Sequence, residues 1–125
     1  MRQFRTSTLI LLLILATYAC SSGGGDPADI VEKYLTAKVN RDAGTVASLL
    51  CSEMEANLER EVHTFDTVTG VTIENMDCQR DAGADTVTCQ GKIVANYGTE
   101  KQEFPLGKYR VVQEDGEWKW CGEAG

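Results

Sequence analysis

The sequence predicts an α+β domain in which three N-terminal helices pack on a curved, four-stranded antiparallel sheet. Apolar residues recur at one-turn spacing between residues 26 and 65, which is typical of amphipathic helices. From Thr67 onward the apolar period changes to two, which is typical of half-buried strands. The chain has 125 residues, so it has room for one such domain at most.

The predicted helices have recognisable start and stop residues. The first is expected to begin after Asp26, which can cap it, with Pro27 at its first position, and to end at NRDAG. The second is expected to follow Asp42. The third covers SEMEANLEREVHTF and opens with a capping box from Ser52 to Glu55. Each helix has one apolar stripe: Ile30, Val31, Tyr34 and Leu35 in the first, Val46, Ala47, Leu49 and Leu50 in the second, and Met54, Leu58, Val62 and Phe65 in the third.

The four predicted strands are separated by turn residues. TVTCQGKIVANY, residues 86–97, alternates apolar and polar positions. In the strand before it the apolar residues change phase, so a β-bulge is expected near Glu74–Asn75. The last two strands, residues 100–113 and 117–121, flank Asp115-Gly116, a dipeptide typical of two-residue hairpin turns. Pro105 lacks an amide hydrogen, so its strand is expected to be an edge or a bulge at that point.

Four of the five cysteines, Cys51, Cys78, Cys89 and Cys121, fall in the predicted domain. If Cys78 faces Cys89 across the first hairpin, Gly83 becomes the first central residue of its turn, as a type II′ turn requires. We therefore expect a Cys78–Cys89 disulfide and, by elimination, a Cys51–Cys121 disulfide. A metal site is the rival interpretation, but the chain has no C-x-x-C motif and a single histidine, so no metal is expected.

The fifth cysteine, Cys20, follows an apolar run over residues 9–16 that is too short to cross a bilayer as a helix. Basic residues precede the run, Ala19 is the small residue suited to a cleavage point, and SSGGG after Cys20 suits a flexible tether. This pattern resembles a bacterial lipoprotein signal. It predicts a signal peptide over residues 1–19, a lipid on the Cys20 thiol, a tether over residues 20–25 and the folded domain over residues 26–125. The alternative is ordinary signal cleavage that leaves Cys20 as a free thiol.

The chain is acidic, with a formal net charge of −7. Removal of residues 1–19 leaves 10 basic against 19 acidic residues, and therefore a charge of −9. Such a chain is repelled by phosphate backbones and anionic lipid surfaces, so nucleic acid is not an expected partner. Contact with a membrane of the cell envelope is expected through the lipid on Cys20.

Residues with catalytic potential are few. His63 is the only histidine, and Asp66 follows it at helical spacing. The two form either an acid–base pair at a pocket mouth or a solvated pair on a helix surface. The charged segment EREV is interpreted as an exposed helix face. The sequence has neither a G-x-S-x-G motif nor a phosphate-binding glycine loop after a strand, so no catalytic residue and no cofactor are assigned.

Three aromatic residues share one face of the last hairpin. With Asp115-Gly116 as the turn, Trp118 and Trp120 lie on the same face as Tyr109. If the Cys51–Cys121 disulfide faces the helices, the aromatic face is the outer one, where it would form an interface or pocket for a homodimer or another protein. In the alternative, the tryptophans are core residues and the disulfide crosses at the sheet edge.

The segment DPADIVEKYLTAKVNRDAGTVASLL, followed by strands that end in GEWKWC, resembles the nuclear transport factor 2-like (NTF2-like) superfamily, which has a cystatin-like α+β fold. More narrowly, the chain resembles small bacterial lipoproteins in which such a domain has no known function. The resemblance covers Asp26 to Cys121. It implies a cone of sheet and helices with a pocket, and frequently dimerisation through the sheet. Some superfamily members are enzymes with pocket Asp and Tyr residues, but no equivalent Asp is placed in this sequence.

Together these features predict a lipid-anchored, extracytoplasmic module that binds a protein or small molecule and is not an enzyme. The alternative is a small pocket enzyme of the isomerase or dehydratase type.

Overall fold

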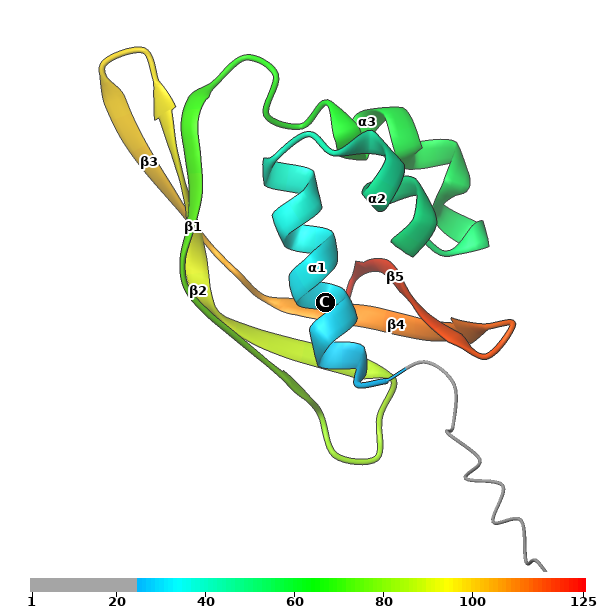
Figure 1. The fold of residues 1–125 in the computed structure, drawn as a ribbon. Coiled ribbons are helices and arrows are strands. Elements are labelled where there is room, and N and C mark those ends of the chain that lie inside the picture. The colour runs from blue at the N-terminus through cyan, green and yellow to red at the C-terminus, as the bar shows by residue number, and fades with distance from the viewer. Residues whose placement is uncertain (1–24) are drawn as a thin grey trace, which may run out of the picture.

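The computed structural model describes residues 25–125, so the predicted signal peptide and Cys20 lie outside the described residues. Helices come first in this part of the chain and strands follow (Figure 1). The helical elements are α1 (Pro27–Val39), α2 (Ala43–Leu49), a 3₁₀-helix η1 (Ser52–Asn57) and α3 (Leu58–Val62). The strands are β1 (Thr69–Arg80), β2 (Thr86–Tyr97), β3 (Glu100–Pro105), β4 (Lys108–Glu114) and β5 (Glu117–Glu123).

Helix α1 forms as its sequence predicts, whereas only the second half of the third predicted helix is α-helical. Asp26 caps α1 by accepting a hydrogen bond from the Ala28 N–H at 2.9 Å. The predicted capping box at Ser52 is wrong, because the Ser52 N–H and hydroxyl both donate to the carboxylate of Glu114 on β4. With this cap missing, the segment starts as the 3₁₀-helix η1 and becomes α-helical only from Leu58.

The sheet has five strands, so the predicted four-strand count is wrong. The stretch predicted as one strand divides into β3 and β4, which pair with opposite halves of β2. The division falls at Pro105, which has no N–H to continue the ladder. The Leu106 N–H then donates to the Gly91 carbonyl, which holds the segment between β3 and β4 against β2. The sheet order is β1-β2-β4-β5, with β3 also paired to β2.

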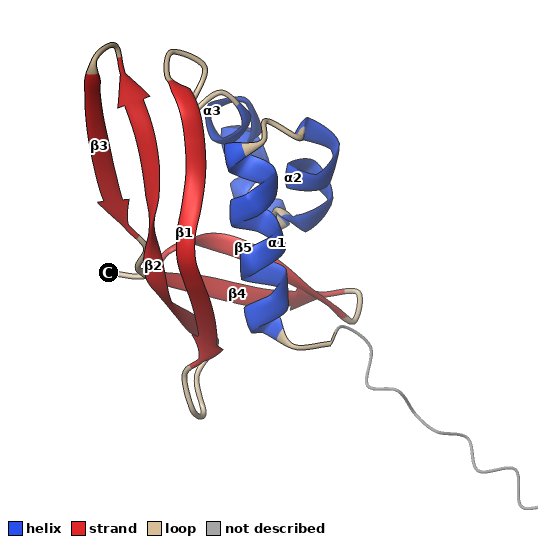
Figure 2. Ribbon diagram, turned by 60° about the vertical axis from the view of Figure 1, so that its left-hand side comes forward, coloured by secondary structure: helices blue, strands red, loops and turns tan. Residues whose placement is uncertain are grey.

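The predicted β-bulge in β1 is confirmed. Glu74 faces Lys92 but Asp77 faces Gln90, so β1 has one extra residue at this point, and Asn75 there has a φ of +54°. Gly91 of β2 lies opposite with a φ of +103°, and a Cβ at this position would come within 2.6 Å of the Glu74 carbonyl oxygen. The bulge bends the strand pair. The helices lie on one side of the resulting curved sheet (Figure 2).

One of the two predicted hairpin turns is confirmed, and the other is shifted by one residue. Asp115-Gly116 forms the predicted two-residue turn, with φ values of +52° and +79° and with Glu114 paired to Glu117. In the first hairpin Cys78 faces Cys89 as expected. However, the Ala84 N–H bonds to the Asp81 carbonyl, so Gly83 is the second and not the first central residue of its turn.

The aromatic face of the last hairpin is core, so the alternative in which the tryptophans are core residues is confirmed and the exposed outer face is not found. Tyr109, Trp118 and Trp120 are all buried. The Cys51–Cys121 disulfide joins the start of η1 to the edge strand β5, beside a hydrogen bond from the Cys51 N–H to the Trp120 carbonyl. The disulfide therefore crosses at the sheet edge and leaves the helix-covered face to the aromatic side chains.

The second disulfide joins Cys78 to Cys89 across β1 and β2. Two disulfides are typical of a protein in an oxidising, extracytoplasmic setting. None of the helices described between residues 25 and 125 has the length and hydropathy needed to span a membrane.

Candidate functional site

A cavity of about 250 Å³ lies between the helices and the concave face of the sheet, and we call it the cleft. Its walls come from α1, from the loop after α3 and from all strands except β1. Most of its residues are apolar or aromatic, as in most small-molecule sites. The lining residues are Leu35, Lys38, Thr64, Phe65, Ile93, Tyr97, Phe104, Pro105, Leu106, Tyr109, Trp120 and Glu123.

Two aromatic side chains of the cleft are exposed. Tyr97 at the end of β2 and Phe104 in β3 keep 40% and 38% of their surface accessible. Their rings lie edge to face with centroids 6.2 Å apart. They are the two exposed large hydrophobic residues in the described part of the chain, so this end of the cleft carries its most accessible apolar surface.

A second, more polar cavity adjoins the cleft, and we call it the recess. The two share Lys38, Thr64, Trp120 and Glu123. The recess also contains Glu61, which is the one buried charged residue among residues 25–125, with 5% of its surface accessible. The remaining recess residues are Met54, Arg60, His63 and Gly122.

Glu61 is held by three side chains from two helices. Its Oε2 accepts hydrogen bonds from the Tyr34 hydroxyl at 2.8 Å and from Lys38 Nζ at 2.7 Å, both on α1. Its Oε1 lies 3.6 Å from the Arg60 guanidinium. A buried carboxylate requires such partners, because it has lost its hydration.

The network fixes the protonation of both acids. Burial opposes ionisation of Glu61, but the hydrogen bond and charge of Lys38, together with the Tyr34 hydroxyl, outweigh it and lower the pKa of Glu61. Burial and the hydrogen bond to Glu61 raise the pKa of Tyr34. At neutral pH the network therefore holds Glu61 as a carboxylate and Tyr34 as a neutral phenol.

Trp120 forms the boundary between the cleft and the recess. Its ring stacks on Tyr34 with centroids 4.0 Å apart and an interplanar angle of 10°. Lys38 Nζ lies 6.0 Å from its ring centroid. Its indole N–H is the one buried side-chain donor without a partner in the described part of the chain. Buried polar groups without a partner are rare in folded proteins.

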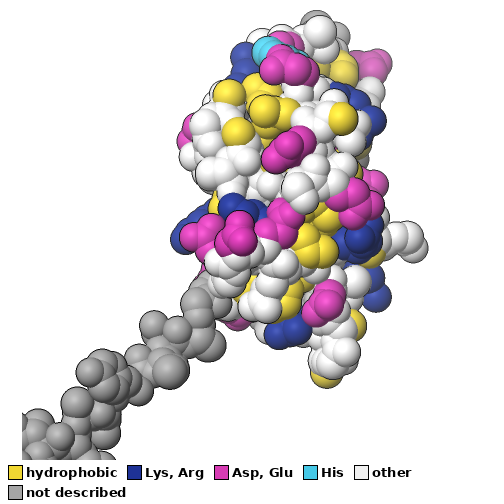
Figure 3. Space-filling view, turned by 90° about the vertical axis from the view of Figure 1, so that its right-hand side faces the viewer, with side chains coloured by type: hydrophobic (Ala, Val, Ile, Leu, Met, Phe, Trp, Pro, Cys, Tyr) yellow, Lys and Arg dark blue, Asp and Glu magenta, His cyan; other side chains and the backbone are white. Residues whose placement is uncertain are grey.

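The His63–Asp66 pair lies on the surface. His63 Nδ1 is 2.6 Å from Asp66 Oδ2, and the two side chains are 55% and 45% accessible. Figure 3 shows the histidine at one end of the helical face, next to acidic side chains. The hydrogen bond and charge of Asp66 raise the pKa of His63. Of the two alternatives, the pair is therefore the solvated one on the surface. His63 also borders the recess.

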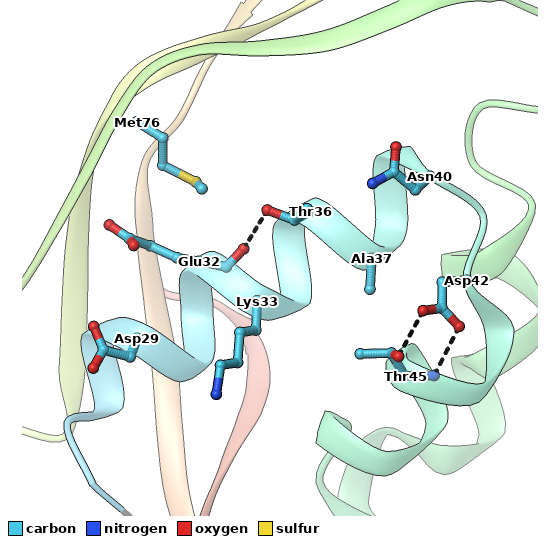
Figure 4. A pocket seen from close by; sticks show the side chains of 9 residues that line it. All are labelled: Asp29, Glu32, Lys33, Thr36, Ala37, Asn40, Asp42, Thr45 and Met76. Atoms are coloured by element: carbon cyan, nitrogen blue, oxygen red, sulfur yellow. Dashed lines mark hydrogen bonds between the residues drawn. The ribbon is translucent and has the colours of Figure 1, made fainter.

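A third hollow, which we call the groove, lies between α1, α2 and β1, with Met76 facing the polar side chains of α1 (Figure 4). Two of its three carboxylates, those of Glu32 and Asp42, already have structural roles. Glu32 accepts a hydrogen bond from the Cys78 N–H, and Asp42 caps α2 through the Thr45 N–H and hydroxyl. These groups serve the fold, so the groove is a weaker candidate than the cleft.

Sequence reasoning placed two of the cleft residues and missed the network beside them. Tyr109 and Trp120 line the cleft, while Trp118 packs elsewhere, with the Arg80 guanidinium over its ring at 4.9 Å. The EREV segment, interpreted as exposed, contains the buried Glu61. A usable signal exists, since Glu61 lies at helical spacing between Leu58 and Phe65 on the apolar stripe. Residues 25–125 contain no cluster of three potential metal-ligating side chains.

Comparison with known proteins supports the fold. No protein-family model and no curated protein sequence matches the chain. Among solved structures, a SEC-C motif-containing protein from Rhodopseudomonas palustris matches with a TM-score of 0.55 and 12% identity, over 80% of this chain and 79% of that one. An NTF2-like protein from Burkholderia thailandensis matches with a TM-score of 0.53 and 18% identity, over 77% of this chain and 88% of that one. The likeness concerns the fold alone: the described residues share their α+β fold with these two structures.

Proposed function

We propose that the protein is a lipid-anchored, extracytoplasmic binding module that holds a small apolar molecule in the cleft and does not catalyse a reaction. The observation that carries this proposal is the cleft itself, a cavity of about 250 Å³ with aromatic walls and an exposed aromatic pair, Tyr97 and Phe104. Covering such surface with an apolar ligand is favourable, at about 25 cal/mol per Å² removed from water.

The anchoring part of the proposal rests on the sequence. Cys20 follows a signal-like apolar run and precedes a Ser/Gly tether, and the other four cysteines are paired with one another in the structure. Mass spectrometry of the mature N-terminus checks this point. A diacylglyceryl mass on Cys20 supports the anchor, and an unmodified Cys20 thiol rejects it.

The non-catalytic part rests on Glu61, which is the buried acid beside the cleft and could serve as the general base of an isomerase or dehydratase. A general base works best with a pKa near the working pH. The pKa of Glu61 is instead lowered, and its Oε2 is already engaged by Lys38 and Tyr34. A carboxylate in this state serves as a structural counter-ion and is a weak proton acceptor.

Ligand binding is tested by equilibrium dialysis of 2-ethylnaphthalene, an uncharged hydrocarbon of two fused rings, against the purified domain. We expect saturable binding that Phe104→Ala weakens about tenfold, since a buried aromatic contact contributes about 1.5 kcal/mol. Met76→Ala, in the groove, is the matched control and is expected to bind like the wild type. Equal loss in both variants, or no saturable binding at all, would contradict the proposal.

A further inference from the structure

The outer edge of β3 is an open strand edge. Figure 2 shows β3 at the side of the sheet away from the helices, and all of its residues are exposed. Groups of the chain itself occupy part of the other two edges. In β1 the Cys78 N–H donates to the Glu32 carboxylate. In β5 the Trp120 carbonyl accepts from the Cys51 N–H. An unpaired edge is a template for pairing with another strand.

The backbone groups at this edge belong to the odd-numbered residues of β3. The Leu106 N–H donates to the Gly91 carbonyl at 2.9 Å, and bonded and non-bonded pairs alternate along antiparallel strands, so the even-numbered residues bond to β2. The N–H and carbonyl groups of Lys101 and Glu103 therefore point outward, together with the carbonyl of Pro105. Among residues 25–125 these groups have no hydrogen-bond partner.

Charged side chains of three strands form a row that ends at this edge. Lys92 Nζ on β2 lies 2.9 Å from Glu103 on β3 and 3.8 Å from Glu74 on β1. The row lies on the sheet face away from the helices, because Phe104, on the opposite face of β3, lines the cleft. Two carboxylates and one ammonium leave the row with a surplus negative charge. Lys101, two residues from Glu103, is on the same face and carries the opposite charge.

These groups fit a second copy of the same strand in one register. When Lys101 lies opposite the partner's Glu103, two-fold symmetry repeats the pair, and each pair exchanges two backbone hydrogen bonds and joins opposite charges. A shift by two residues in one direction puts two copies of Lys101 opposite each other. A shift in the other direction does the same with Glu103 and brings in Pro105, which has no N–H. Like charges directly opposite each other are destabilising.

The same register brings partner atoms to an exposed aromatic ring on the other face of β3. It places Phe104, which is 38% accessible, opposite the partner's Glu100, whose methylene groups can cover part of the ring. It also places Gln102 opposite the partner's Gln102. A side-chain amide both donates and accepts, so these two amides can bond to each other. The register therefore leaves no like charges opposed on either face.

We propose that two copies of this protein pair antiparallel through the outer edges of their β3 strands, with Lys101 of each copy opposite the partner's Glu103. The sheet then continues from one copy into the other. The charged row runs from Glu74 through Lys92 and Glu103 to the partner's Lys101, which balances its charge. The interface uses the edge of the sheet and not its face. It goes beyond the proposed function, because it concerns a second copy of the chain and no ligand.

Sedimentation equilibrium of the purified domain tests the pairing, in about 0.15 M salt, which screens the repulsion between two acidic chains. The interface is small, so we expect a weak, reversible dimer with a dissociation constant below about 1 mM. Lys101→Glu replaces each attractive pair by a repulsive one and is expected to weaken the dimer at least about tenfold. Lys33→Glu makes the same charge change at an exposed position of α1 and is the matched control, expected to associate like the wild type.

Mixing two variants distinguishes this register from any other association. Lys101→Glu opposes two glutamates and Glu103→Lys opposes two lysines, so each alone is expected to associate weakly. In an equimolar mixture every lysine of one variant faces a glutamate of the other, and we expect much of the wild-type association to return. A wild type that stays monomeric up to about 1 mM, a dimer that Lys101→Glu leaves intact, or a mixture no stronger than its components would each overturn the pairing. None of these results bears on the binding of 2-ethylnaphthalene in the cleft.

Discussion

The Glu61–Lys38 and His63–Asp66 pairs are similar in chemistry and opposite in surroundings. Both join an acid to a nitrogen base, at 2.7 Å and 2.6 Å, and Glu61 and His63 are two residues apart in the chain. In the first pair the side chains of Glu61 and Lys38 are 7% and 18% accessible. In the second, those of Asp66 and His63 are 45% and 55% accessible.

The difference shows that residue type alone does not identify the charged pair that contributes most to the free energy of unfolding. His63 attracts notice because it is the only histidine, yet water screens its pair with Asp66. Glu61 looks like an ordinary surface glutamate, yet its charge is buried beside the cleft and depends on Lys38 and Tyr34. Four measurements can break or sharpen this comparison.

The largest effect is expected from Lys38→Met. It leaves the Glu61 carboxylate buried with Tyr34 and Arg60 as its remaining partners, and breaking a buried pair in this way costs about 3 kcal/mol of unfolding free energy. Urea unfolding measures the loss. The double variant Lys38→Met/Glu61→Leu is expected to recover most of it, because no unpaired charge remains. A Lys38→Met domain as stable as the wild type would show that Glu61 is solvated after all.

A smaller loss is expected from Tyr34→Phe. The phenol donates to a carboxylate at 2.8 Å, and a hydrogen bond to a charged group contributes about 1.5 kcal/mol. The ring remains and keeps its stacking on Trp120, so the change isolates the hydroxyl. Tyr97→Phe, which removes a hydroxyl from a 40% exposed side chain, is the matched control and is expected to leave the urea midpoint unchanged.

Part of this molecule could be predicted because its signals are local. The alternation along β2 and the phase change before it fixed the pairing of Cys78 with Cys89 and the bulge at Asn75. Asp115-Gly116 likewise encodes its turn within the dipeptide. In each case the relevant physics, the two-residue period or a positive φ, acts between neighbouring residues.

The rest could not be predicted because it depends on contacts between distant segments. Ser52 gives up its capping role to Glu114, which is 62 residues away in the sequence. Glu61 is buried because α1 brings Lys38 and Tyr34 to it, 23 and 27 residues away. The lining of the cleft also requires the strand division at Pro105, which places Phe104 and Leu106 on its wall. The helical spacing could have placed Glu61 on the apolar stripe, but the sequence pattern does not identify partners that are this distant in the chain.

The third expected effect is a pH dependence that belongs to the buried pair. The folded pKa of Glu61 is lowered below its usual value of 4.5. Its stabilising effect is therefore complete above that pH and is lost as the pH falls through the folded pKa. We expect the stability gap between the wild type and Lys38→Met to be widest at neutral pH and to narrow in acid. Other carboxylates contribute equally to both proteins, so a gap that stays constant with pH would contradict this assignment.

The smallest effect is expected at the surface pair. The pKa of His63 is raised by the hydrogen bond and charge of Asp66. The pair therefore contributes stability below the unfolded pKa of about 6.5 and loses it as the pH rises through the folded pKa. We expect His63→Gln to match the wild-type urea midpoint in mild alkali, to fall slightly below it in mild acid, and to match it again in high salt, which screens exposed charges. Asp66→Asn should show the same pH-dependent change together with a small loss that does not depend on pH in this range, because it also removes the ion pair between Asp66 and Arg41 at 3.6 Å. A salt-resistant loss as large as that of Lys38→Met would mean that the two pairs are energetically alike, and burial would then not explain the difference between them.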